Sequence, residues 1–146
     1  MRRDSDRGRS ADGRGAGGAA EGDGRRRERR RVLLVEDNRN LRLTTARMLE
    51  HLGYEVAAVG DGPAAVETFR RNPPDVSIVD MGLPGMSGRE VLDAFRAHAP
   101  RAPVVLCSGA PEDLVVVAEV APPVESLAKP YDIETLSAAL KRILGA

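Results

Sequence analysis

The chain has 146 residues, with 22 basic and 22 acidic side chains and one cysteine. This length is typical of a single domain with one hydrophobic core. One cysteine excludes an intrachain disulfide, which fits a reducing compartment. Because no apolar run approaches the length needed to span a membrane, the sequence predicts a cytoplasmic protein without a membrane anchor.

The zero net charge is the sum of two unlike parts. Residues 1–31 contain eleven arginines and six acids, whereas residues 32–146 contain eleven basic and sixteen acidic side chains. Residues 1–30 have no aromatic or branched aliphatic side chain, so we predict a disordered Arg/Gly-rich tail before a folded domain over residues 31–146. The arginine block could contact nucleic acid, but a solubilising tail is the simpler interpretation because no aromatic residue could stack on bases.

Five short apolar segments alternate with amphipathic segments along the rest of the chain. The predicted strands are residues 32–35, 55–59, 75–79, 102–107 and 124–128. The predicted helices begin near residues 38–40, 63, 88, 111 and 133, and the last runs to residue 144. This alternation predicts an α/β fold, a parallel sheet with helices on both faces, made doubly wound by right-handed crossovers.

Polar side chains stand where four of these strands end. Glu36 and Asp37 follow the first strand, Asp80 the third, Ser108 the fourth and Lys129 the fifth. The carboxyl ends of parallel strands meet at one edge of a sheet, where open α/β sheets bind their ligands. The sequence therefore predicts one site with three acids, a hydroxyl and an ammonium.

This mixture of groups favours a metal-dependent reaction. Three carboxylates in one pocket repel one another, and a divalent cation removes that conflict. Oxygen ligands without a neighbouring histidine or cysteine favour Mg²⁺. The Glu36-Asp37 pair alone fits an ordinary strand-to-helix turn equally well, and Lys129 alone could be a surface lysine. Their combination with Asp80 favours a site.

Four motifs in this order resemble the receiver domain of bacterial two-component response regulators. They are Glu36-Asp37-Asn38, residues 80–88 (DMGLPGMSG), Ser108-Gly109-Ala110 and Lys129-Pro130-Tyr131. The resemblance covers residues 31–146. It implies a flavodoxin-like, five-stranded parallel sheet in the order 2-1-3-4-5 with five helices, like that of the chemotaxis regulators.

The resemblance also implies the chemistry. Asp80 is expected to be the nucleophile that accepts a phosphoryl group, with Lys129 and Ser108 contacting the phosphoryl oxygens. The donor would be a sensor histidine kinase or a histidine phosphotransfer protein. The chain would thus be an acceptor rather than a turnover enzyme. With no DNA-binding domain after the last helix, its output would be a binding event or a phosphate relay.

The implied metal ligands are Asp37, Asp80 and the backbone carbonyl of Gly82, with Glu36 acting largely through water. Gly88, in the loop after Asp80, is expected to supply backbone angles that other residues avoid. The resemblance also implies a cis peptide bond after Lys129.

Two other functions are compatible with parts of this pattern. A magnesium-dependent phosphatase of the haloacid-dehalogenase type also uses an aspartyl nucleophile, but it usually has a second aspartate two residues later, where this chain has Gly82. A phosphate-independent interaction module would not need the complete set Asp37, Asp80, Ser108 and Lys129.

The chain departs from the family three positions before the lysine, where Ser126 replaces the usual aromatic residue. This departure argues against the usual switch, in which the aromatic side chain turns inward. We expect instead that the loop after Ser108 and the helix after it carry the response. That helix contains Leu114 and three valines, so at least one apolar side chain should be exposed, and Val116 or Val117 is the expected contact for a partner.

Overall fold

The computed structural model describes residues 29–145. The predicted tail falls almost entirely on residues 1–28, which lie outside the described residues, so it stays a prediction. From Arg31 onward, strands and helices alternate along the chain as the sequence predicts. The strands are β1 (Arg31–Val35), β2 (Glu55–Val59), β3 (Val76–Asp80), β4 (Val104–Ser108) and β5 (Val124–Ala128). The helices are α2 (Arg39–His51), α3 (Gly62–Arg71), α4 (Gly88–His98), α5 (Asp113–Ala118) and α6 (Ile133–Leu144).

The five strands form one parallel sheet in the order β2-β1-β3-β4-β5, which confirms the predicted fold class and strand order. In the register of the central strands, Leu34 of β1 lies opposite Ala58 of β2 on one side and Ile78 of β3 on the other. β1 and β3 are therefore neighbours although β2 and α3 separate them in sequence. This arrangement places the carboxyl ends of β1 and β3 side by side.

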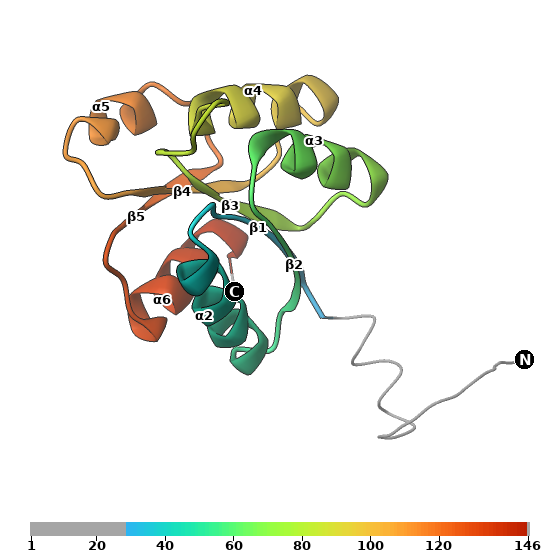
Figure 1. Ribbon diagram of the computed structural model, residues 1–146, viewed down its shortest axis with the longest axis vertical. Coiled ribbons are helices and arrows are strands. Elements are labelled where there is room, and N and C mark those ends of the chain that lie inside the picture. The colour runs from blue at the N-terminus through green and yellow to red at the C-terminus, as the bar shows by residue number, and fades with distance from the viewer. Residues whose placement is uncertain (1–28, 146) are drawn as a thin grey trace, which may run out of the picture. The chain divides into compact units, whose positions relative to one another are not determined.

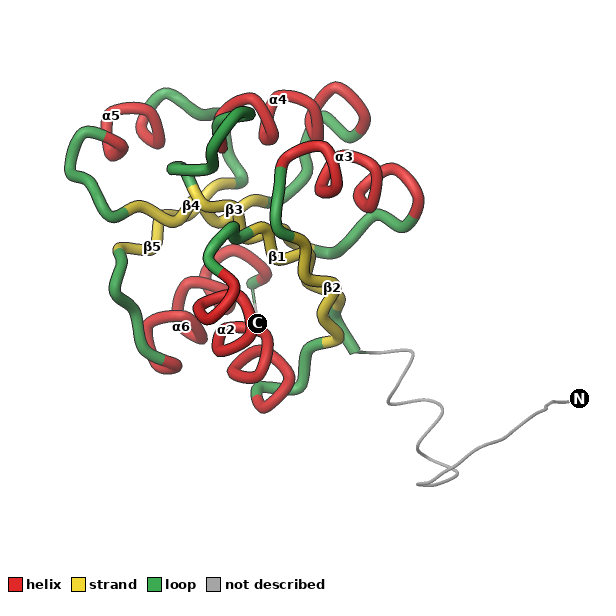
Figure 2. The backbone as a smooth tube through the Cα atoms, in the orientation of Figure 1, coloured by secondary structure: helices red, strands yellow, loops and turns green. Residues whose placement is uncertain are grey.

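Helices cover both faces of the sheet. α3, α4 and α5 lie on one face, while α2 and α6 lie on the other (Figure 1 and Figure 2). Because successive strand side chains point to opposite faces, each central strand contributes to two cores. Leu33 packs with Phe69 and Phe95 on the first face, and Leu34 packs with Leu49 and other apolar residues on the second. Both cores hold the sheet rigid beneath the site.

Two strands begin and end later than the sequence predicts. β3 ends at Asp80 and β4 ends at Ser108, so both polar residues are the last residues of their strands. Asp75, predicted to begin β3, lies before the strand, where its side chain accepts a hydrogen bond from the Arg31 N–H at 2.7 Å. The backbone of Asp80 and of Ser108 is therefore paired with a neighbouring strand of the sheet.

Polar caps fix where the helices begin. Asn38 caps α2, since its side chain accepts a hydrogen bond from the Leu41 N–H at 2.9 Å. This contact fixes the start of α2 within the predicted range of residues 38–40. Ser87 and Glu90 form a capping box at the start of α4. Among the described residues, no helix is both long enough and apolar enough to cross a membrane.

α5 is only six residues long and begins later than predicted. The residues before it form a tighter turn, in which the Leu114 N–H donates to the Pro111 carbonyl at 3.1 Å. The chain after α5 is held by Arg96 of α4, whose guanidinium donates to the carbonyls of Ala102, Ala121 and Pro123. The two ends of α5 are therefore attached to the domain by different kinds of contact.

Candidate functional site

The structure brings the predicted site residues together at the carboxyl edge of the sheet. Glu36 follows β1, Asp80 ends β3, Ser108 ends β4 and Lys129 follows β5. Glu36, Asp80 and Ser108 are buried, with only 3%, 7% and 8% of their surface exposed, whereas Asp37 is exposed. The site therefore combines one exposed acid with three buried polar groups.

Lys129 joins two of the carboxylates. Its Nζ lies 2.9 Å from Glu36 Oε1 and 3.0 Å from Asp80 Oδ2. The Lys129 N–H also donates to the Ser108 carbonyl at 2.7 Å, which extends the β4–β5 pairing to the lysine itself. The ammonium therefore projects from a backbone fixed by the sheet. The Lys129–Pro130 peptide bond is cis, as the resemblance implies.

Three carboxylates cluster around this ammonium. Glu36, Asp37 and Asp80 can each place one oxygen within 4.8 Å of the others. One lysine cannot neutralise three acids, so the cluster retains negative charge when all three are ionised. An all-oxygen, negatively charged group with one exposed member fits a hard divalent cation such as Mg²⁺, which accepts few protein ligands and keeps several waters.

Burial and charge shift the ionisation of two groups. The pKa of Glu36 is raised, chiefly by burial and also by the charge of Asp80, although the Asn38 N–H and Lys129 act in the opposite direction. Burial on its own would lower the pKa of Lys129, but its hydrogen bonds to Glu36 and Asp80 raise it overall. The lysine is therefore held as a cation, and burial makes the ionised form of Glu36 less favourable than usual.

The loop after β3 turns closely over Asp80. The Gly82 N–H donates to Asp80 Oδ1 at 3.0 Å, which leaves Oδ2 facing Lys129. A Cβ on Gly88 would lie 2.7 Å from the Asp80 carbonyl oxygen and 2.8 Å from Met81 Cα. Gly88 is thus needed for space and not for the unusual backbone angles predicted from the sequence. In this loop the positive φ, 79°, occurs at Gly85.

Ser108 lies in the site, but its hydroxyl is hydrogen-bonded to residues of the turn that leads into α5 and not to the three clustered carboxylates. Its Oγ donates to Asp113 Oδ2 at 2.6 Å, lies 2.7 Å from the Ala110 carbonyl and accepts from the Ala110 N–H at 3.0 Å. The sequence analysis did not find Asp113 as a site neighbour. An acid at this position is also explained by the preference for acids in a first helical turn, so the sequence alone does not indicate the contact.

Arg42 is a second residue that the sequence analysis missed. Its Nη1 donates to the Glu36 carbonyl at 2.8 Å, and the Asn38 N–H donates to Glu36 Oε2 at 3.0 Å. Both contacts fix the turn between β1 and α2. The Glu36 carboxylate is therefore held at one oxygen by backbone and at the other by Lys129.

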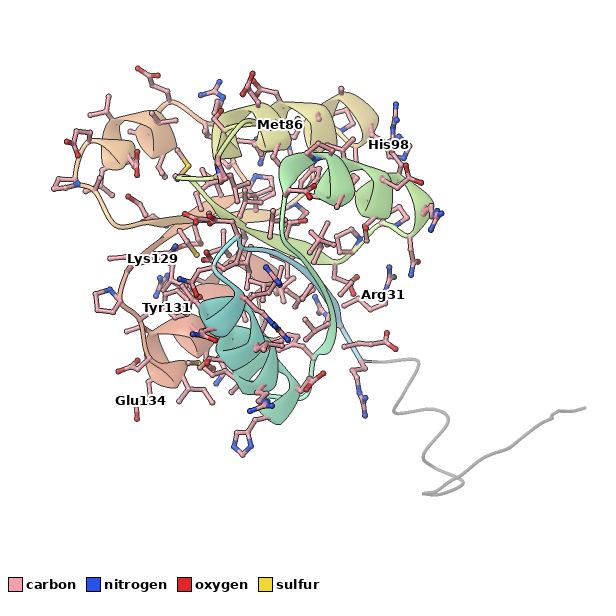
Figure 3. All side chains as sticks on the ribbon, in the orientation of Figure 1. Arg31, Met86, His98, Lys129, Tyr131 and Glu134 are labelled. Atoms are coloured by element: carbon pink, nitrogen blue, oxygen red, sulfur yellow. The ribbon has the colours of Figure 1, made fainter. Side chains whose placement is uncertain are left out.

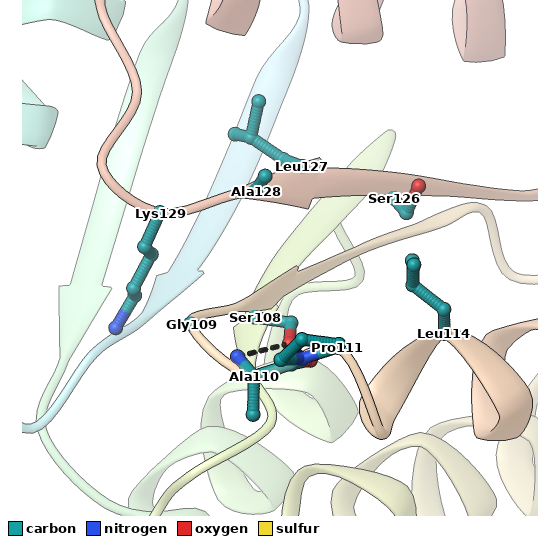
Figure 4. A pocket seen from close by; sticks show the side chains of 9 residues that line it. All are labelled: Ser108, Gly109, Ala110, Pro111, Leu114, Ser126, Leu127, Ala128 and Lys129. Carbon is teal, nitrogen blue, oxygen red and sulfur yellow. Dashed lines mark hydrogen bonds between the residues drawn. The ribbon is translucent and has the colours of Figure 1, made fainter.

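Ser126 lines a cavity of about 270 Å³ next to the site. The cavity is also lined by Ser108, Leu114 and Lys129. Figure 4 shows the Leu114 side chain of α5 pointing toward β5 near Ser126, with Lys129 directed away from both. The missing aromatic side chain has therefore left space between β5 and α5.

Tyr131 does not fill this space. Its hydroxyl lies 2.7 Å from Thr45 Oγ1 of α2, and the ring packs with the second core. Burial raises the pKa of Tyr131 to about 12. Figure 3 shows Tyr131 and Lys129 on the segment that follows β5. Tyr131 is thus a structural contact between this segment and α2.

The apolar residues of α5 divide into exposed and packed pairs. Leu114 and Val115 are 55% and 63% exposed, whereas Val116 is half-buried and Val117 packs against the first core. This confirms that part of the apolar helix is exposed. It corrects the choice of Val116 and Val117 as the expected contacts for a partner, since Leu114 and Val115 form the exposed surface.

The single cysteine takes no part in the predicted chemistry. Cys107 is buried in β4, and burial raises the pKa of its thiol to about 12. A thiol with this pKa remains protonated at neutral pH and is a poor nucleophile. Cys107 is therefore a small apolar residue of the second core.

Comparison with known proteins identifies the family. The response regulator receiver domain matches residues 32–141 of this chain. The chain therefore belongs to the response regulator receiver domain family. Members of this family serve as phosphoryl acceptors in two-component signalling, so the resemblance stated from the motifs is confirmed.

Several relatives carry names from signalling. The sensory transduction protein RegX3 of Mycolicibacterium smegmatis is 35% identical over 115 residues, which are 77% of this chain and 50% of RegX3. The transcriptional regulatory protein CseB of Streptomyces avermitilis is 32% identical over 118 residues, which are 80% of this chain and 50% of CseB. This chain spans about half the length of these relatives.

Solved structures share the fold. The chemotaxis protein CheY4 of Vibrio cholerae aligns with a TM-score of 0.73 and 30% identity, covering 80% of this chain and 99% of CheY4. The receiver domain of the sensor histidine kinase PA1611 of Pseudomonas aeruginosa aligns with a TM-score of 0.73 and 30% identity, covering 81% and 99%. The PA1611 structure has a magnesium ion coordinated in its active-site cleft.

Proposed function

We propose that this chain accepts a phosphoryl group on Asp80 from the phosphohistidine of a sensor histidine kinase or a histidine phosphotransfer protein, in a reaction that requires Mg²⁺. The observation that carries the proposal is the position of the Lys129 ammonium, 2.9 Å from Glu36 and 3.0 Å from Asp80. A buried nucleophilic carboxylate beside a fixed cation and two further acids is suited to phosphoryl transfer, which depends on positioning and charge neutralisation.

The proposed metal ligands are Asp37, Asp80 and the carbonyl of Gly82, with Glu36 contributing through water. The clustering of the three carboxylates within 4.8 Å supports this set, as does the magnesium-bound structure of the PA1611 receiver domain. A bound Mg²⁺ would neutralise charge on the phosphoryl oxygens during transfer.

The remaining chemistry belongs to side chains of this chain. An Asp80 oxygen attacks phosphorus, so an O–P bond forms while the P–N bond of the donor phosphohistidine breaks. The donor imidazole leaves with the electron pair. Lys129 contacts a phosphoryl oxygen through its ammonium, and Ser108 donates its hydroxyl proton to another. A carboxylate has no proton to lose, so its attack needs no general base.

The proposed setting is a cytoplasmic signalling pathway. The folded unit is the receiver domain over residues 31–146, which acts as a phosphoryl acceptor and not as a turnover enzyme. Its partners are the phosphohistidine donor and a downstream protein that recognises the phosphorylated form. The names of RegX3 and CseB support a signalling role of this kind.

Phosphotransfer from a panel of autophosphorylated histidine kinases tests the proposal. The intact protein should be labelled when Mg²⁺ is present and not when it is chelated, and Asp80→Asn should abolish labelling. Asp93→Asn, a change of the same kind on the exposed face of α4, should be labelled normally. Equal labelling of Asp80→Asn and the wild-type protein would reject Asp80 as the acceptor.

A further inference from the structure

The Ser108 hydroxyl is fully engaged with the start of α5. It has one proton to donate. Besides the Ala110 carbonyl at 2.7 Å, this proton can go to the Asp113 carboxylate, the nearer and charged acceptor, at 2.6 Å. This distance is typical of a charge-assisted O–H···O⁻ bond, which is stronger than a bond between neutral groups. The Ala110 N–H donates to the same oxygen at 3.0 Å, so the hydroxyl is fixed from two sides.

The same proton is the one that a phosphoryl group on Asp80 would require. A single hydroxyl cannot donate to Asp113 and to a phosphoryl oxygen with its one proton. We propose that Asp113 is a positioning residue that holds the Ser108 hydroxyl in the first turn of α5 until a phosphoryl group on Asp80 takes it away. The inference rests on the proposed function, because Asp80 must be the acceptor for this competition to occur.

Electrostatic repulsion and the competition for the Ser108 proton both act against the contact between Ser108 and Asp113. A phosphoryl group adds negative charge to the site, and a nearby carboxylate is then repelled. Asp113 is half-buried at the start of α5, so this repulsion is screened less than between fully exposed groups. The Ser108 hydroxyl changes its hydrogen-bond acceptor from Asp113 to the phosphoryl group, and the Asp113 carboxylate is repelled. Both effects favour release of Asp113 from the site.

The space beside α5 would allow the helix to move once Asp113 is released. Leu114, the next residue, borders the cavity of about 270 Å³ that Ser126 leaves between β5 and α5. In Figure 4 the segment from Ser108 to Pro111 lies beside this space. The Ser108–Asp113 pair would thus connect phosphorylation to α5 without the aromatic residue that this chain lacks.

The first arm of the test measures beryllofluoride affinity with Mg²⁺ by following amide resonances. Asp113→Ala should raise the affinity by about tenfold, the effect of removing one charge-assisted competitor. In the Ser108→Ala background, Asp113→Ala should give a clearly smaller gain in affinity, because only the relief of charge repulsion remains. Glu112→Ala removes the same charge from the neighbouring, exposed residue and should change the affinity by less than about twofold. An equal gain in both backgrounds would overturn the proposal and leave only long-range repulsion.

The second arm uses no phosphoryl mimic and so separates this inference from the proposed function. Side-chain couplings should show one Ser108 rotamer in the wild-type protein and in Glu112→Ala, but averaged rotamers in Asp113→Ala. Averaging in the wild-type protein, or one unchanged rotamer in Asp113→Ala, would overturn the role of Asp113. If beryllofluoride does not bind the wild-type protein, the proposed function fails and so does the competition that this inference requires, even where the rotamer result is as expected.

Discussion

The Lys129 ammonium lies 3.0 Å from a carboxylate oxygen of Asp80. Before any phosphoryl group arrives, the proposed nucleophile is therefore already paired with the cation proposed to bind the phosphoryl group. The same ammonium contacts Glu36 at 2.9 Å, which is one of the acids proposed to attract the metal. Lys129 thus reduces the negative charge that a divalent cation would otherwise encounter.

Lys129→Ala should bind Mg²⁺ more tightly and respond less to phosphorylation. Two unit charges at about 4 Å interact by roughly 1–4 kcal/mol in water-like to surface-like surroundings, so removing the ammonium should tighten Mg²⁺ binding by about tenfold. The amide shift changes on adding beryllofluoride should shrink, because a contact that differs between the two states has been lost. Titrations followed by amide resonances measure both effects. Lys141→Ala, on the exposed side of α6, is the matched control, and the full wild-type response in Lys129→Ala would contradict the assignment.

Glu36 should make the stability of the metal-free protein depend on pH. Its pKa is raised above the usual 4.5, chiefly by burial, so the folded chain retains a proton that the unfolded chain has released. The free energy of unfolding should therefore fall as the pH rises from 4.5 through the folded pKa. Urea titrations at several pH values should show that Glu36→Gln removes this pH dependence of the free energy of unfolding. Glu67→Gln, at an exposed position of α3, should not remove it. A parallel pH dependence in wild type and Glu36→Gln would show that other groups are responsible.

Binding of Mg²⁺ should stabilise the folded protein and so offset the free-energy cost of burying Glu36 and Asp80. A ligand that binds only the folded state at 100 times its dissociation constant stabilises it by about 2.7 kcal/mol. Thermal unfolding with and without Mg²⁺ should show this gain in the wild-type protein and much less in Asp37→Asn. A similar gain in Asp37→Asn would place the cation outside the carboxylate cluster.

Gly88→Ala should distort the loop that follows Asp80. The added Cβ would meet backbone atoms of Asp80 and Met81 at 2.7 and 2.8 Å, and these atoms cannot rotate away. We expect a loss of about 1–3 kcal/mol, as for other overpacking substitutions, together with slower phosphorylation. For Gly82→Ala, in the same loop, the Cβ would lie 3.7 Å from Asp80 Oδ1, an ordinary contact, so the loss of stability should be smaller. Equal losses in urea unfolding would show that the close approach at Gly88 is relieved elsewhere.

A negative charge should affect stability very differently at two positions of α5. Val117 packs against the first core, so Val117→Asp should cost about 2 kcal/mol or more, as for a charge placed in a packed site. Val115 is 63% exposed, so Val115→Asp should change stability by less than about 0.5 kcal/mol. If the exposed residues contact a partner, Val115→Asp should weaken binding to it without changing phosphorylation. Unchanged binding would place the output surface elsewhere.

The sequence predicts the fold well because the strands carry two independent signals. The apolar runs of β1, β3 and β4 are buried almost throughout, and each predicted strand is followed by a turn or a cap, so the order of elements could be read directly. The convergence of Glu36, Asp80, Ser108 and Lys129 follows from parallel strands whose ends share one edge. These predictions needed no information about side-chain direction.

What the sequence could not provide depends on local geometry. Asp113 contacts Ser108 because the turn after β4 folds back on itself, and an acid at the start of a helix has an adequate explanation without that contact. Similarly, four apolar residues in α5 indicate that some are exposed, but the short helix and its tight first turn decide that Leu114 and Val115 are the exposed ones. The space-filling role of Gly88 likewise depends on how closely the chain passes Asp80.

The guanidinium of Arg96 gives α5 one fixed end. It ties the chain on both sides of the Pro122–Pro123 bond and the turn before β4 to α4 through three carbonyls. The other end of α5 is attached to the site through one hydroxyl and one carboxylate. If the contact with Ser108 is broken, a six-residue helix held in this way would turn about its fixed end near Val120. A displacement that starts at Asp113 would therefore be larger at Leu114 and Val115 than at the residues nearer Val120. The exposed apolar pair thus lies in the part of α5 that would move most.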